Sequence, residues 1–128
     1  MSVVDVGPRE RRAAGPIQFD GLAGRLRALG DENRLRIFAL LTRAEFCVCE
    51  LEDALGLSQS LVSNHLRVLK RAGLVRARRD AVDARWIYYS LDGKAVESLR
   101  GSLLRLLDLS QLDQSLAHCG PERERRRR

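Results

Sequence analysis

The sequence predicts an α+β fold that is mainly helical, with the element order α-α-α-α-β-β-α. Two observations lead to this prediction. Apolar residues recur at three- and four-residue steps through four successive stretches of residues 20–73. Residues 74–91 are instead rich in β-branched and aromatic residues, and a leucine-rich segment with helical periodicity follows them. We expect one domain over residues 19–119, between a mobile arm at 1–18 and a disordered Arg-rich tail at 120–128.

Composition limits the classes of protein to which the chain can belong. The 128 residues are 45% hydrophobic and 31% charged, which is typical of a globular protein. Apolar runs such as residues 37–41 are too short to span a membrane, and residues 1–16 contain no apolar segment of a secretory signal. We therefore expect a cytoplasmic protein with no membrane partner. In that compartment three cysteines are expected as metal-binding, reactive or buried thiols rather than as disulfides.

Two helices are predicted before residue 42. Asp20 is a candidate cap for the first, which ends at Gly30, and Asp31 is a candidate cap for the second. Arg34 and Arg36 are expected on the solvent side of the second helix. The first helix carries Leu22, Leu26 and Leu29 at near-helical spacing. The apolar stripe of the second, expected to run through the core, consists of Leu35, Ile37, Phe38, Leu40 and Leu41.

A closely spaced helix pair follows. Residues 45–56 read as a short third helix that ends at Gly56, and Ser58 is the candidate cap of a fourth that ends at residues 72–73. A tight turn between two short helices has the proportions of a helix-turn-helix. The inward residues of the fourth helix are predicted to be Leu61, Val62, Leu66 and Leu69. Its outward side chains, which would read base edges in the major groove, are Gln59, Ser60, Ser63, Asn64 and Arg67.

Residues 74–79 and 85–91 are predicted to form a hairpin, the wing of a winged helix-turn-helix. Residues 58–91 carry seven basic side chains against two acidic ones, and a folded basic segment indicates a polyanionic partner, most often nucleic acid. We expect Lys70 and the wing arginines Arg78, Arg79 and Arg85 to contact the DNA backbone. Ser58 and His65, at the start and on the body of the fourth helix, complete the predicted DNA-binding set.

The last predicted helix begins after Asp92 and carries nine apolar residues through Leu116. That is more apolar surface than one helix face can bury against a small domain. The surplus predicts a homodimer.

Four runs of the sequence closely resemble the ArsR/SmtB family of metal-responsive winged-helix repressors. They are Leu29-Gly30-Asp31-Glu32-Asn33-Arg34-Leu35-Arg36-Ile37, Cys47-Val48-Cys49-Glu50-Leu51, Ser58-Gln59-Ser60-Leu61-Val62-Ser63-Asn64-His65-Leu66 and Ala72-Gly73-Leu74-Val75. The resemblance covers about residues 20–92. It implies a homodimer on palindromic double-stranded operator DNA, which is released when a thiophilic metal or metalloid binds. It also implies that Cys47 and Cys49 belong to the metal box of the arsenic/antimony and cadmium/lead sensors.

The chain departs from the family patterns in its other ligands. Glu52 stands where arsenic sensors of one branch have a third cysteine, and residues 1–46 contain no cysteine. The histidines are only His65 and His118, unlike the sets of zinc sensors. A three-sulfur site would therefore need Cys119. Such a site favours As(III) or Sb(III) as inducer, with Cd(II) or Pb(II) as the alternative.

The cysteine pair also predicts a conformational change. Residues i and i+2 of a helix are rotated by roughly 200°, so Cys47 and Cys49 would need a distorted first turn to face one ion. Free N–H groups at the start of that helix would lower the thiol pKa values. Acidic neighbours with no nearby base would favour a divalent cation such as cadmium; these are Glu45, Glu50, Glu52 and Asp53.

Two other classes of protein fit parts of the pattern. In a redox-responsive repressor of the same fold, the three cysteines would form disulfides rather than bind an ion. A thiol oxidoreductase is disfavoured because the sequence has no Cys-x-x-Cys motif and no βαβ frame. We therefore expect that the chain is not an enzyme.

Overall fold

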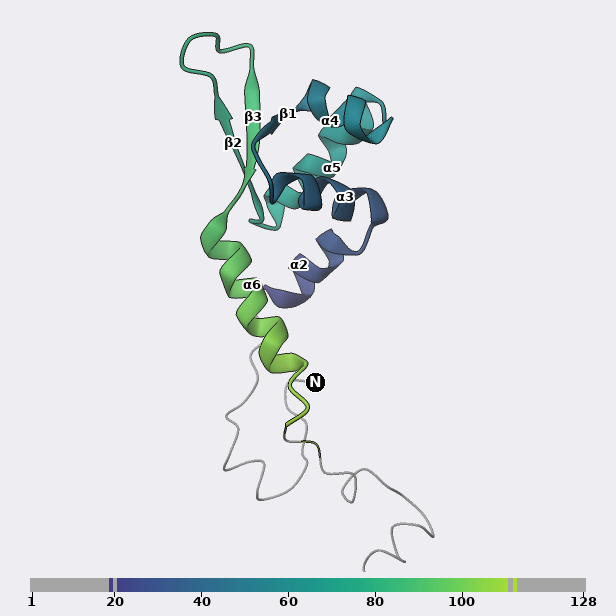
Figure 1. The fold of residues 1–128 in the computed structure, drawn as a ribbon, viewed down its shortest axis with the longest axis vertical. Helices are drawn as coiled ribbons and strands as arrows, with labels where there is room; N and C mark the ends of the chain where they lie inside the picture. Colours follow the sequence, from purple (N-terminus) through teal and green to yellow (C-terminus); the bar gives the residue numbers. More distant parts are fainter. Residues whose placement is uncertain (1–18, 20, 111, 113–128) are drawn as a thin grey trace, which may run out of the picture. The chain divides into compact units, whose positions relative to one another are not determined.

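The computed structural model describes residue 19, residues 21–110 and residue 112 (Figure 1). In this part of the chain the predicted order of helices and strands is confirmed, with one further strand. The elements are α2 (Leu22–Leu29), α3 (Glu32–Leu41), β1 (Phe46–Cys47), α4 (Val48–Leu55), α5 (Gln59–Arg71), β2 (Val75–Arg79), β3 (Ile87–Leu91) and α6 (Gly93–Leu106). Asp20–Ser102 form one compact unit, and the described residues from Leu103 onward belong to a second unit.

Helix α3 begins with the predicted cap. Asp31 Oδ1 accepts the backbone N–H groups of Asn33 at 2.9 Å and Arg34 at 3.1 Å, which satisfies two free donors of the first turn. Two predictions for α3 are wrong: Leu35 is half exposed, and Arg34 is not on the solvent side. Arg34 Nε donates to the carbonyl oxygen of Ala28, because the free carbonyls at the end of α2 face the start of α3. The predicted cap Asp20 lies outside the described residues.

Helices α4 and α5 form the predicted helix-turn-helix. Gly56 ends α4 with φ 67°, a conformation that glycine adopts at little cost, and Ser58 Oγ accepts the Leu61 N–H at 3.3 Å to cap α5. The buried residues of α5 are Val62, His65, Leu66 and Leu69. This i, i+3, i+4, i+7 stripe leaves out Leu61, which is 48% exposed although we expected it in the core.

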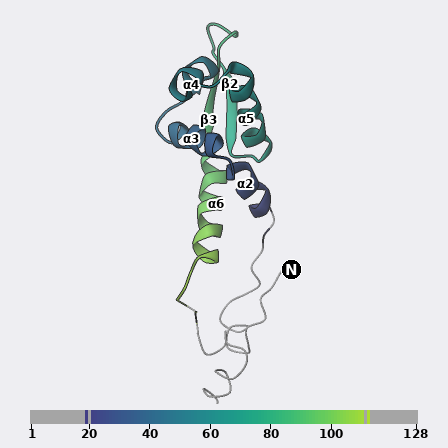
Figure 2. The same cartoon turned by 90° about the vertical axis from the view of Figure 1, so that its right-hand side faces the viewer.

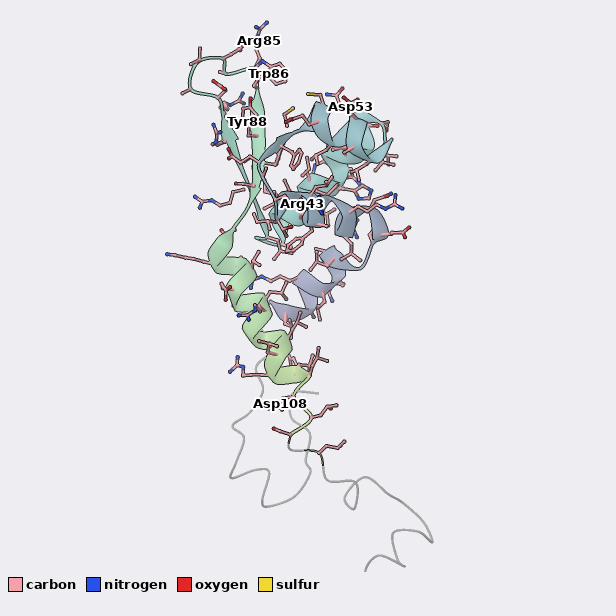
Figure 3. All side chains as sticks on the ribbon, viewed as in Figure 1. Arg43, Asp53, Arg85, Trp86, Tyr88 and Asp108 are labelled. Carbon is pink, nitrogen blue, oxygen red and sulfur yellow. The ribbon has the colours of Figure 1, made fainter. Side chains whose placement is uncertain are left out.

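The predicted hairpin is confirmed as β2 and β3, which pair antiparallel from Val75 opposite Leu91 to Arg79 opposite Ile87. Asp80 N donates to the Trp86 carbonyl at 2.9 Å and closes the loop. Two views show this loop extending past the helices (Figures 1 and 2). Trp86 and Arg85 lie at that end of the hairpin (Figure 3).

A third strand was not predicted. Residues of β1 pair antiparallel with β3, Phe46 opposite Tyr89 and Cys47 opposite Tyr88, which gives the sheet order β1-β3-β2. The prediction that the third helix starts at Glu45 is therefore wrong, because the two residues that precede Val48 are extended and bonded to the hairpin.

Helix α6 is shorter than predicted. Asp92 Oδ1 accepts the Ala95 N–H at 3.1 Å at its start, as expected, but the helix ends at Leu106 rather than continuing toward Leu116. Asp108 Oδ1 accepts the Ser110 N–H at 2.9 Å, a local turn that competes with helix continuation. The apolar residues left exposed from here on are Leu104, Leu106, Leu107, Leu109 and Leu112. No helix of the described residues has the length and apolar character that a membrane span requires.

Candidate functional site

The two thiols of residues 47–49 meet at the start of α4. Cys47 is the N-cap residue and has extended backbone angles, φ −86° and ψ 168°. Its N–H donates to Glu50 Oε1 at 2.9 Å, and this contact lowers the pKa of Glu50. The Sγ atoms of Cys47 and Cys49 lie 2.8 Å apart, within hydrogen-bonding reach. The prediction that the pair needs a distorted turn is thus wrong, because Cys47 precedes the helix and its side chain does not follow the helical rotation.

The two thiols differ in environment. Cys47 is 5% exposed, whereas Cys49 is exposed. Burial raises the pKa of Cys47 to about 11, and the hydrogen bond with Cys49 adds to the rise. The predicted lowering of the pKa is therefore wrong for Cys47, because loss of solvation outweighs the helix N-terminus and the Glu50 carboxylate lies close by.

The donor set fits a thiophilic ion only in part. Two sulfurs on one short segment suit a soft acceptor, and with metal–sulfur bonds of ~2.3 Å a tetrahedral site separates its sulfurs by ~3.7 Å. Cys47 and Cys49 would therefore move apart by less than one bond length. Within the described residues, no group of three or more His, Cys, Asp or Glu side chains could hold a metal ion. The predicted third ligand, Cys119, and His118 lie outside them.

The acidic residues around the thiols have a basic partner, contrary to prediction. Arg78, on β2, donates from Nε to Glu45 Oε2 at 2.9 Å and from Nη2 to Glu45 Oε1 at 2.6 Å. This bidentate contact lowers the pKa of Glu45 and raises that of Arg78. The Arg78 guanidinium also lies 4.9 Å from the ring centre of Tyr88, on β3.

The polar residues predicted to read DNA lie along α5 and its cap. Those that the structure leaves exposed are Ser58, Gln59, Ser60, Asn64, Arg67 and Lys70, whereas Ser63 is half-buried. Arg67 Nη1 donates to Asn64 Oδ1 at 3.1 Å, so these two exposed side chains orient each other on α5.

His65 is the exception on α5. It is 8% exposed, and its Nδ1 lies 3.3 Å from Arg34 Nη1, on the inner side of the helix. Its inclusion among the DNA-binding residues is therefore corrected: His65 packs between α5 and α3.

The wing arginines are exposed but already make contacts within the hairpin. Arg85 donates to both carboxylate oxygens of Asp83, at 2.7 Å from Nη2 to Oδ2 and 3.0 Å from Nε to Oδ1. Arg79 Nη1 donates to the Ala84 carbonyl at 2.9 Å. Together with the Arg78 contact, these bonds position three cations on one hairpin and partly neutralise two of them.

Sequence reasoning did not identify Tyr88 or the role of Glu45. The contacts of both residues depend on β1, which follows Glu45 and pairs with β3 at Tyr88. A strand of two residues is too short to give a periodic pattern in the sequence. One charged residue, Glu45, followed by the apolar Phe46 and Cys47 does not distinguish a strand from the first turn of a helix.

Comparison with known proteins identifies the family. Residues 31–77 match the sequence profile described as bacterial regulatory protein, arsR family. The solved structure of HlyU from Vibrio cholerae superposes with a TM-score of 0.56 at 36% identity, covering 69% of this chain and 92% of that one. The chain belongs to the ArsR family.

Curated relatives in the ArsR family carry different functional names. The arsenic resistance transcriptional regulator ArsR1 of Pseudomonas putida is 37% identical over 66% of this chain and 65% of its own length. A cadmium resistance regulatory protein CadC homolog of Staphylococcus aureus is 35% identical over 57% of this chain and 59% of its own length. HlyU, named a transcriptional activator, is 40% identical over 63% of this chain.

Membership decides the class of function. ArsR-family proteins are DNA-binding transcriptional regulators and not enzymes, as predicted from the sequence. The matched residues of this ArsR-family chain run from the start of α3 through α4 and α5 to the first residues of β2, and so include the helix-turn-helix.

Proposed function

We propose that this chain is a homodimeric transcriptional repressor that leaves a palindromic operator when a thiophilic metalloid or metal binds Cys47 and Cys49. The observation that carries the proposal is the 2.8 Å separation of the two sulfurs at the start of α4. A soft acceptor that bridges them would act on the start of the first helix of the helix-turn-helix.

The inducer is proposed to be As(III) or Sb(III), with Cys119 as the third ligand, and Cd(II) or Pb(II) as the second choice. Three sulfurs without histidine suit a trigonal metalloid. The acidic side chains near the thiols favour a divalent cation less than expected, because Arg78 partly neutralises Glu45. The names of the Pseudomonas and Staphylococcus relatives are consistent with either choice.

DNA contact is proposed to use two surfaces. Gln59, Ser60, Asn64 and Arg67 are exposed on α5, where side chains of such a helix reach base edges in the major groove. Lys70 and the wing arginines Arg78, Arg79 and Arg85 would hold phosphates. Exposed leucines at the end of α6 and beyond it supply apolar surface suited to a dimer interface.

The 2.8 Å separation also favours a second candidate, a thiol-redox-responsive repressor. Peroxide would oxidise the two thiols to a disulfide and be reduced to two waters, with both thiol protons transferred to the peroxide oxygens. The raised pKa of Cys47 counts against it, because thiolate is the species that reacts with peroxide.

One titration tests both candidates. The reduced protein is titrated with arsenite, Cd(II), Pb(II) and Zn(II) while release from promoter DNA and sulfur-to-metal absorption are followed. We expect arsenite or Cd(II) to release DNA with the appearance of the absorption band, and Cys47→Ser and Cys49→Ser each to abolish both signals. Release by peroxide but by none of the ions would establish the redox candidate instead.

A further inference from the structure

An ion pair connects the thiol segment to the wing. Glu45 and Arg78 are 33 positions apart in the chain, and their side chains form two parallel hydrogen bonds although they remain 38% and 55% exposed. Two bonds in a fork geometry fix the guanidinium more firmly than one point contact does. The fold therefore holds a wing arginine with a carboxylate that lies two residues before Cys47.

The sheet register places the participants in one row. Cys47 lies opposite Tyr88 on β3, and Tyr88 lies opposite Arg78 on β2. Side chains that pair across antiparallel strands point to the same face of the sheet, so the thiol, the ring and the guanidinium share a face. The Arg78 guanidinium contacts the Tyr88 ring at 4.9 Å, and Glu45 reaches it from the chain just before β1. Cys47 thus adjoins both contacts of Arg78, because Tyr88 lies opposite it and Glu45 precedes it by two residues.

We propose that Glu45 competes with the phosphates of DNA for Arg78, and that a soft ion at Cys47 and Cys49 releases DNA in part by strengthening the hold of Glu45. This inference rests on the proposed function. A phosphate at Arg78 would approach the Glu45 carboxylate, and two anions on one guanidinium repel each other. Arg78 therefore contacts a DNA phosphate only when its ion pair with Glu45 is broken.

The ion acts through the same contact. An inducer lowers DNA affinity only if it binds the DNA-free conformation more tightly, and a Glu45–Arg78 pair that competes with phosphate would favour that conformation. Transmission requires that separation of the two sulfurs moves Cys47, which lies at one end of β1, while Glu45 precedes the other end. The pair is thus a short connection from the thiols to the wing, separate from the one through α4 and α5.

The test is the variant Glu45→Gln, which removes the charge and keeps the size of an exposed side chain. Binding to labelled random-sequence duplex and to a duplex from the promoter of its own gene is measured by fluorescence anisotropy over a series of salt concentrations. We expect both duplexes to bind roughly twofold to fivefold more tightly, the range of an exposed ion pair. The slope of log affinity against log salt should steepen by up to ~0.9, the contribution of one phosphate.

Glu97→Gln is the matched control, because Glu97 is also exposed and paired with an arginine, Arg100, at 3.6 Å. It changes the net charge equally and should leave the slope unchanged. In an Arg78→Ala background, Glu45→Gln should have no further effect on affinity. Equal effects of Glu45→Gln and Glu97→Gln, or weaker binding by Glu45→Gln, would overturn the competition.

The inducer arm uses Cd(II) and arsenite with the same variants. Glu45→Gln should keep the sulfur-to-metal absorption titration of the parent protein while the ion-induced loss of DNA affinity becomes smaller by the same twofold to fivefold factor. An unchanged loss would overturn the part of the inference that concerns transmission. If the parent protein shows neither the absorption nor release, the proposed function fails, whereas competition for Arg78 is still decided by the random duplex.

Discussion

Cys47 and Tyr88 face each other across strands β1 and β3. In the sheet order β1-β3-β2, only β3 separates the strand of Cys47 from β2. Cys47 is also the N-cap residue of α4, the first helix of the helix-turn-helix. Cys47 is connected to α5 through α4 and to the wing through the sheet. Both parts of the predicted DNA-binding surface adjoin the thiol segment.

The difference between the two thiols predicts their reactivity. Cys49 should react with iodoacetamide first at neutral pH, because it is exposed while Cys47 is buried and protonated. A raised pKa favours the thiol form, so the alkylation rate of Cys47 should rise about tenfold per pH unit until pH approaches about 11. Mass spectrometry of peptides after timed quenching measures both rates. Equal rates at neutral pH would contradict the buried position of Cys47, and the urea-unfolded protein provides the reference in which the two should react alike.

His65 is expected to matter for stability rather than for DNA recognition. Replacing it by Ala removes a buried side chain and its contact with Arg34, which should lower the free energy of unfolding by about 1–3 kcal/mol. Urea denaturation monitors the loss, and DNA affinity is measured at a temperature where the variant remains folded. A selective loss of promoter binding with unchanged stability would return His65 to the DNA-reading set.

Gln59 and Arg79 should separate base reading from backbone contact. Gln59→Ala should weaken promoter binding by about 1–3 kcal/mol and leave random DNA nearly unaffected, because the side chain is exposed on the first turn of α5. Arg79→Ala should weaken both and reduce the salt slope by about one charge. Competition binding with the two duplexes provides the comparison. Equal losses on both duplexes for Gln59→Ala would remove it from the base-reading residues.

The leucines at the end of α6 and just beyond it should determine the association state. Leu107 is 68% exposed, so Leu107→Asp should leave the fold of residues 21–102 intact while placing a charge in the proposed dimer interface. Sedimentation should then show monomer at concentrations where the parent protein is dimeric, with weaker binding to a two-half-site duplex. Leu61→Asp, on an exposed leucine of α5, serves as the control for sedimentation. Unchanged sedimentation of Leu107→Asp would place the interface elsewhere.

Most of the fold could be predicted because its elements carry strong local signals. Asp31, Ser58 and Asp92 accept backbone N–H groups as their positions suggested, and the apolar stripe of α5 fixed its inner face. Errors occurred where a single position depends on its neighbours in space. Leu61 and His65 exchanged their expected environments because the helix rotates 100° per residue and a stripe shifted by one position still looks amphipathic.

The geometry of the candidate site could not be predicted from spacing. The helical rotation argument for Cys47 and Cys49 required both residues to be helical, but Cys47 is held in extended backbone by its pairing with Tyr88. That pairing, like the Glu45–Arg78 contact, joins residues more than thirty positions apart and leaves no local pattern. Chemistry of the donors was readable from the sequence, whereas their distance, burial and partners depend on the folded sheet.

The position of Trp86 supplies the chain with an optical probe of its own. It is the single tryptophan, it is 45% exposed, and it lies beside Arg85 at the end of the hairpin (Figure 3). Emission excited selectively in tryptophan therefore originates from one location, the tip of the wing. Stacking of its indole against a sugar or base of DNA would quench that emission. Stopped-flow fluorescence of the unlabelled protein would therefore measure the rates at which the wing binds DNA and dissociates from it.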